Sequence, residues 1–181
     1  MFRQSSLILA LAAIVGTAHA QQSGMTTAQS KPLIRSALAA APANVAAHAA
    51  VMAPGADGKM IKLRDGTNGF TCFPDDKDHS GAACADAESM KWMEAYISHA
   101  AKPTNSAPGV MYMLAGGIDA SATDPYAKLV RGKGVVSGPH WMLMWPASSK
   151  ETGLPNTPKR TGTWIMWDGT PYAHLMINQR P

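Results

Sequence analysis

Short apolar stretches bounded by turn residues dominate the chain after residue 58. Residues 59–64 alternate between polar and apolar positions, which is typical of a strand with one buried face. Further strands are predicted at 70–73, 109–116, 163–167 and 171–177, and at 135–146 with an interruption at Gly138-Pro139. Asp168-Gly169-Thr170 separates the last two stretches, and we expect a hairpin there.

Helical spacing occurs in two parts of the chain. Apolar residues recur at helical intervals from Leu33 to Ala41 after a capping Ser30, and a second alanine-rich helix is predicted over 44–50. The clearest helix opens at Asp86 or Ser89 and places four large side chains on one face, Met90, Met93, Tyr96 and Ile97. Because consecutive strands are joined too tightly for helical crossovers, the pattern predicts an α+β fold. We expect a mostly antiparallel sheet packed by N-terminal helices and one central helix, in a single domain over 31–181.

The first twenty residues have the three-part layout of a secretory signal peptide. Arg3 precedes an apolar run over 7–15, and Ala18 and Ala20 supply the small residues of a cleavage site. The run is too short to span a bilayer. The sequence therefore predicts a signal peptide over 1–20, cleavage near Ala20 and a flexible tail over 21–30. We expect a soluble periplasmic or secreted protein without a membrane span.

Composition narrows the choice of partner and of redox compartment. The chain of 181 residues is 46% hydrophobic and 15% charged, with a formal net charge of +4. No basic run accompanies that charge, so the sequence does not indicate a nucleic-acid partner.

Cys72 and Cys84 are the two cysteines of the chain. In an oxidising compartment such a pair usually joins, and a disulfide across the turn-rich loop between them is predicted.

A His-x-Met pattern occurs in two of the predicted strands. His140 precedes Met142 by two residues, and His174 precedes Met176 in the same way. Side chains two apart share one face of a strand, so each histidine lies beside its methionine. Met111 and Met113 form a similar pair on the earlier strand predicted at 109–116. If these strands are neighbours, imidazoles and thioethers converge into a ligand set that favours copper, Cu(I) above all.

Other interpretations of the same residues stay open. Methionine packs well against aromatic rings, so the stripes are also explained as core. The histidines could serve a small-ligand site together with Asp119 and Asp124. An exported enzyme would use His140 or His174 with Asp119, Asp124 or Asp168 for proton transfer, although no nucleophile with a partnered base is recognisable. The third class is a structural or interaction protein without a ligand.

Several stretches resemble a family of exported bacterial proteins. They include GTNGFTCFPD at 66–75, DASATDP at 119–125, GPHWM at 138–142 and GTPYAHLM at 169–176. The matching stretches are spread over most of the chain after the predicted signal peptide, so the resemblance is to the whole domain. It implies a recurrent exported domain, and it implies no activity, cofactor or catalytic residue.

Overall fold

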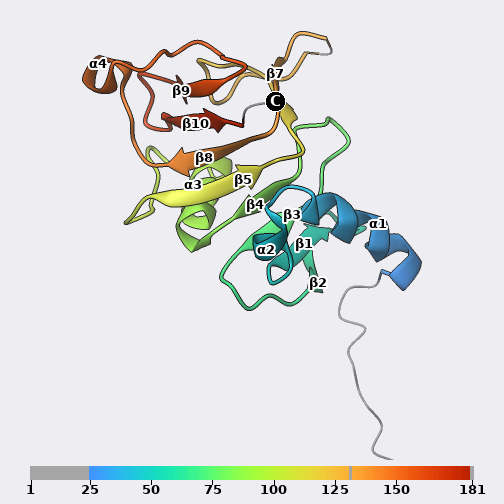
Figure 1. Ribbon diagram of the computed structural model, residues 1–181. Coiled ribbons are helices and arrows are strands. Elements are labelled where there is room, and N and C mark those ends of the chain that lie inside the picture. The colour runs from blue at the N-terminus through green and yellow to red at the C-terminus, as the bar shows by residue number, and fades with distance from the viewer. Residues whose placement is uncertain (1–24, 131, 180–181) are drawn as a thin grey trace, which may run out of the picture.

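The computed structural model describes residues 25–130 and 132–179 (Figure 1). The predicted signal peptide, 1–20, lies outside the described residues, as do residues 21–24 of the predicted tail. The predicted tail is wrong at its other end, because residues 27–30 already belong to a helix.

One large sheet organises the chain and confirms the expected α+β class. Its eight strands follow the order β2 (Met60–Arg64), β1 (Ala50–Pro54), β3 (Thr71–Phe73), β4 (Ala83–Ala85), β5 (Gly109–Met113), β8 (His140–Met144), β10 (His174–Asn178) and β9 (Gly162–Met166). All neighbours are antiparallel except β1 and β3, which run parallel. The predicted hairpin is confirmed by the pairing of β9 with β10.

The helices begin at side-chain caps. Helix α1 (Thr27–Leu38) starts at Thr26, whose hydroxyl accepts from the Gln29 backbone while the Gln29 side chain accepts from the Thr26 backbone. This capping box satisfies otherwise unpaired amides, which explains why the helix begins before the expected Ser30. Helix α3 (Ala87–Ile97) is capped by Asp86, as one of the two predicted starts requires. Two short helices, α2 (Ala43–Ala46) and α4 (Ser149–Thr152), complete the set given by the described residues.

The two longer helices cover opposite faces of the sheet (Figure 1). Helix α1 packs on the face that carries Cys72, Cys84 and Tyr112, over the half of the sheet containing β1 to β4. Helix α3 packs on the face that carries Ala85 and Met111. Since side chains alternate along each strand, the sheet divides the core into two separate hydrophobic clusters.

The predicted disulfide joins Cys72 to Cys84. The two residues are direct partners in the antiparallel register of β3 and β4, and both are fully buried. Their Cα atoms lie 3.9 Å apart, below the usual range of about 4.4–6.8 Å. The register of β3 and β4 brings the two cysteines within reach of each other, as a disulfide requires.

Three short strands were not expected from the sequence. No strand was predicted before residue 59, but β1 covers Ala50–Pro54 with alternating burial. β4 is only three residues long, and two small alanines flank its cysteine. β6 (Gly117–Asp119) lies outside the predicted strands and pairs with β7 (Val135–Ser137) in a separate two-stranded sheet. Strands this short carry too little periodicity to be recognised locally.

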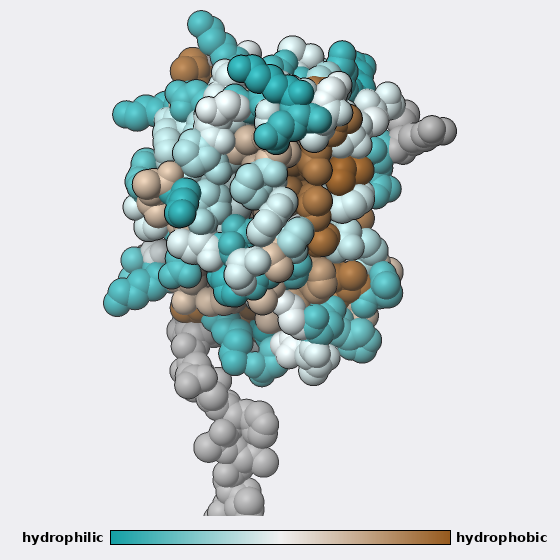
Figure 2. All heavy atoms as spheres, turned by 90° about the vertical axis from the view of Figure 1, so that its left-hand side faces the viewer, coloured by the Kyte–Doolittle hydropathy of each residue, from teal (hydrophilic) through white to brown (hydrophobic). Residues whose placement is uncertain are grey.

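The surface is largely polar. Figure 2 shows one face on which hydrophilic side chains surround a narrow apolar strip. In the parts of the chain that the structure describes, no helix combines the length and hydropathy needed to cross a bilayer.

Candidate functional site

A methionine-rich sheet face forms the floor of the site. In the register of β5, β8, β10 and β9, Met111, Met142, Met176 and Trp164 make one row of cross-strand neighbours. In the next row Met113 lies directly opposite His140, and towards the other end Met166 lies directly opposite His174. The structure therefore confirms that the strands of the two His-x-Met motifs lie side by side.

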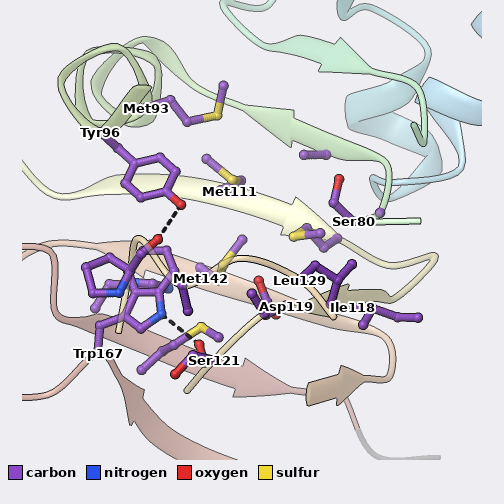
Figure 3. A pocket seen from close by; sticks show the side chains of 18 of the residues that line it. Ser80, Met93, Tyr96, Met111, Ile118, Asp119, Ser121, Leu129, Met142 and Trp167 are labelled. Atoms are coloured by element: carbon purple, nitrogen blue, oxygen red, sulfur yellow. Dashed lines mark hydrogen bonds between the residues drawn. The ribbon is translucent and has the colours of Figure 1, made fainter. Parts of the chain in front are cut away.

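A cavity of about 410 Å³ lies above this floor (Figure 3). Helix α3 contributes Trp92, Met93 and Tyr96 to its wall, and the chain segments 76–81 and 118–129 contribute further lining residues. The cavity reaches both histidines, because His140 and His174 both line it.

Aromatic side chains hold the wall in place. The Trp167 indole Nε1 donates to the Ser121 carbonyl at 2.9 Å, and the Tyr96 hydroxyl donates to the Pro125 carbonyl at 2.6 Å (Figure 3). The rings of Tyr96 and Trp167 stack with their centroids 5.3 Å apart. These contacts fix the segment after β6 against α3 and against the turn between β9 and β10, so the wall is built before any ligand arrives.

His140 presents an unpartnered nitrogen in this buried setting. Its side chain is 1% exposed, and Nδ1 lies 2.7 Å from the Gly138 carbonyl oxygen. Because a carbonyl only accepts, Nδ1 must carry the proton, and Nε2 is left with a free lone pair. Nε2 has no hydrogen-bond partner. Burial lowers the pKa of His140 and favours the neutral ring.

The ring of His174 is oriented in the same way as that of His140, through a hydrogen bond at Nδ1. Its Nδ1 donates to the Tyr172 carbonyl at 3.0 Å, which again places the lone pair on Nε2. Burial lowers the pKa of His174 to about 4. The ring meets the indoles of Trp92 and Trp167 edge-on, with centroids 5.3 and 5.1 Å away. Both histidines are therefore neutral near pH 7.

The two histidines lie on the same face of the sheet but at different positions along the strands. His140 is paired with Asn178, four residues along β10 from His174. At the rise of a strand this offset is about 13 Å, so the register places the two residues towards opposite ends of the cavity floor. Within residues 25–130 and 132–179, no three His, Cys, Asp or Glu side chains are grouped so as to hold a metal ion.

The charged groups of the cavity are all acidic. Its lining includes Asp76, Asp78, Asp119 and Asp124, and the described lining residues include no lysine or arginine. Burial raises the pKa of Asp119 to about 6. Asp124 lies at the exposed rim, where its carboxylate accepts from the Tyr126 backbone. A cavity with this lining attracts cations, although the chain as a whole carries a net charge of +4.

An acid–base pair is not among these features. The hydrogen bonds of the two imidazoles described above go to backbone carbonyls rather than to carboxylates. Asp168, the third aspartate of the enzyme hypothesis, accepts instead from Ser149 and Asn156 beside α4. Its role there is to hold the α4 segment against the β9–β10 turn.

The predicted site residues divide into two groups. Most of them line the cavity: His140, His174, Asp119, Asp124, Met113 and Met142. Met176 is fully buried and is not among the described lining residues. The sequence pattern did not indicate Met166, Trp92 or Trp167 as site residues, although strand alternation places Met166 on the same side of β9 as Trp164.

We expect Asp119→Asn to stabilise the protein at pH 7.5 and not at pH 4. The pKa of Asp119 is raised in the folded state, so its unfavourable ionised form appears as the pH rises through about 6. With allowance for solvent screening, the gain in unfolding free energy is about 1 kcal/mol. Urea denaturation at both pH values measures it. An equal gain at both pH values would contradict the electrostatic cause, and Asp65→Asn on the exposed surface is the control.

Comparison with family models, with curated proteins and with solved structures finds no match for this chain. The resemblance to exported bacterial proteins therefore stays a prediction.

Proposed function

We propose that this protein is an exported binding module for a soft monovalent metal ion, Cu(I). The proposed ligands are the Nε2 atom of His140 and the thioethers of Met113 and Met142. Imidazole and thioether donors together favour Cu(I) over harder ions. The neighbouring pair of His174 and Met176, named with them on sequence grounds, is not needed at this site.

The unpartnered Nε2 of His140 is the observation that carries the proposal. A buried polar atom without a partner is uncommon and is usually explained by a ligand, a water or an ion. The other such atoms in the described residues are Ser89 Oγ and the indole Nε1 atoms of Trp92 and Trp164, and none of these is a usual metal ligand. Met113 lies directly opposite His140, and Met142 follows two residues later on the same face. The Nδ1 hydrogen bond to Gly138 orients the ring as second-shell contacts orient metal-binding histidines.

The negatively charged side chains of the cavity favour binding of a cation. Bringing Cu(I) near Asp119 favours the ionised carboxylate, which burial otherwise disfavours. Binding should therefore strengthen as the pH rises through the pKa of about 6. Neutral histidines add no repulsion to an arriving ion.

Two features of the chain agree with export of a copper-binding module. The predicted signal peptide at 1–20 and the buried disulfide both fit an oxidising compartment. A periplasmic or secreted location follows as part of the proposal.

A small organic ligand is the second candidate. The volume of about 410 Å³ falls within the range of small-molecule sites, and aromatic and methionine side chains dominate such pockets. Asp119 would then select for a cationic group. The enzyme alternative lacks a comparable observation.

Anaerobic competition with bathocuproine disulfonate, a chromophoric Cu(I) chelator, tests the copper proposal. We expect the protein to withdraw Cu(I) from the chelator at pH 7.5 and to compete less well at pH 5. X-ray absorption of the loaded protein should show sulfur and imidazole ligands. Failure to compete at either pH would overturn the proposal, and binding of organic ammonium compounds alone would favour the second candidate.

A further inference from the structure

We propose that the same cavity binds a second Cu(I) ion, through Nε2 of His174 and the thioethers of Met166 and Met144. This inference rests on the proposed copper-binding function and adds a site at the other end of the sheet face. The sequence motif alone does not give this ligand set, because Met166 comes from a strand without a histidine.

The two ends of the cavity floor are built alike. Met166 is the direct partner of His174 across β9 and β10, as Met113 is of His140 across β5 and β8. Cβ atoms of such partners lie about 4.5–5.5 Å apart, so an imidazole and a thioether can bind one ion between them. In both histidines Nδ1 donates to the carbonyl two residues earlier and leaves Nε2 as the ligand atom.

Met144 supplies the third donor of the second site. It follows Leu143, whose partner on β10 is Leu175. One further step of the antiparallel register places Met144 beside His174. Met144, Met166 and His174 all line the cavity, which is space that an ion can enter.

The surroundings of His174 suit a soft ion. Two indole rings, those of Trp92 and Trp167, lie within 5.3 Å of its ring centroid to centroid. These rings pack against the imidazole and surround it with polarisable apolar groups.

The register favours separate ions for the two histidines. Their register offset of four residues corresponds to about 13 Å along the strands. Metal–nitrogen bonds are only about 2 Å long. Two ions, each bound by one histidine and two methionines, fit these positions without a shift of the strands.

The number of Cu(I) ions bound by the full protein tests the inference. Anaerobic titration followed by desalting and metal analysis should give two ions for the wild type and one for His174→Ala. Met166→Leu preserves volume and removes the sulfur, so it keeps the test valid if His174→Ala does not fold. In Met166→Leu we expect the second ion to bind at least about tenfold more weakly and the first ion to bind unchanged.

Tryptophan fluorescence separates the two sites. Because Trp92 and Trp167 contact His174, loading the second site should change their emission, and Met166→Leu should abolish that change at the same metal concentration. Met60→Leu, at an exposed position on β2, is the matched control and should behave like the wild type. One ion in the wild type, unaffected by Met166→Leu, would overturn the second site and leave the first intact. A single ion that needs both histidines would also overturn it, whereas no binding at all would refute the proposed function itself.

Discussion

His140→Ala is expected to weaken Cu(I) binding at the His140 site by at least about 100-fold, or about 2.7 kcal/mol. The reason is that Nε2 is the one nitrogen donor available to the proposed site, and its ring is already oriented by Gly138. Two thioethers alone would bind the ion without that strong ligand. Competition with the chromophoric chelator measures the loss.

Two further variants decide whether the loss is specific. Met142→Leu keeps the packing and removes one sulfur, so its affinity should fall by about tenfold with little change in stability. His48→Ala removes an exposed histidine that does not line the cavity, and its affinity should equal that of the wild type. If all three variants bind alike, His140 is a core residue and not a ligand.

Gly109→Ala is expected to destabilise the protein by about 3 kcal/mol, or roughly 6–12 °C in Tm. A Cβ at Gly109 would lie 2.4 Å from the backbone nitrogen of Ser89 and 2.5 Å from its hydroxyl. The first turn of α3 would have to move away from β5. That movement would break two hydrogen bonds of Asp86, whose carboxylate accepts from the backbone amides of Ser89 and Val110, each at 2.8 Å.

The displaced helix should also alter the cavity, because α3 carries Trp92 and Tyr96 in its wall. Urea denaturation followed by tryptophan fluorescence measures the stability, and chelator competition measures the weakened binding. Gly138→Ala is the matched control for stability alone, since the Gly138 carbonyl also orients His140. Its added Cβ has no heavy atom within 4 Å, and the expected change in unfolding free energy is below about 0.5 kcal/mol. Equal stability of the two variants would show that α3 and β5 are not closely packed in solution.

Local sequence patterns were sufficient for several features of this protein. Apolar periodicity predicted the strand carrying His140 and the final hairpin carrying His174. The spacing and the predicted compartment of the cysteines predicted the disulfide. These features depend on alternation, turn residues and compartment, which neighbouring residues in the chain already specify.

Short elements and their start points depended on contacts that the sequence does not display. The three residues of β4 form a strand because β3 and β5 flank them on both sides. Gln29 moves the start of α1 towards the N-terminus through its reciprocal bonds with Thr26. A short segment has little preference of its own, so its neighbours in space decide its conformation.

The composition of the candidate site was decided by the tertiary structure. The His-x-Met motifs indicated one face of a sheet, but only the antiparallel register shows that His140 and His174 occupy opposite ends of it. The same register brings Met166 to His174, while Met176 becomes core. Strand alternation fixes which face a side chain occupies, whereas strand order and register fix its neighbours, and these arise from pairings between residues far apart in the chain.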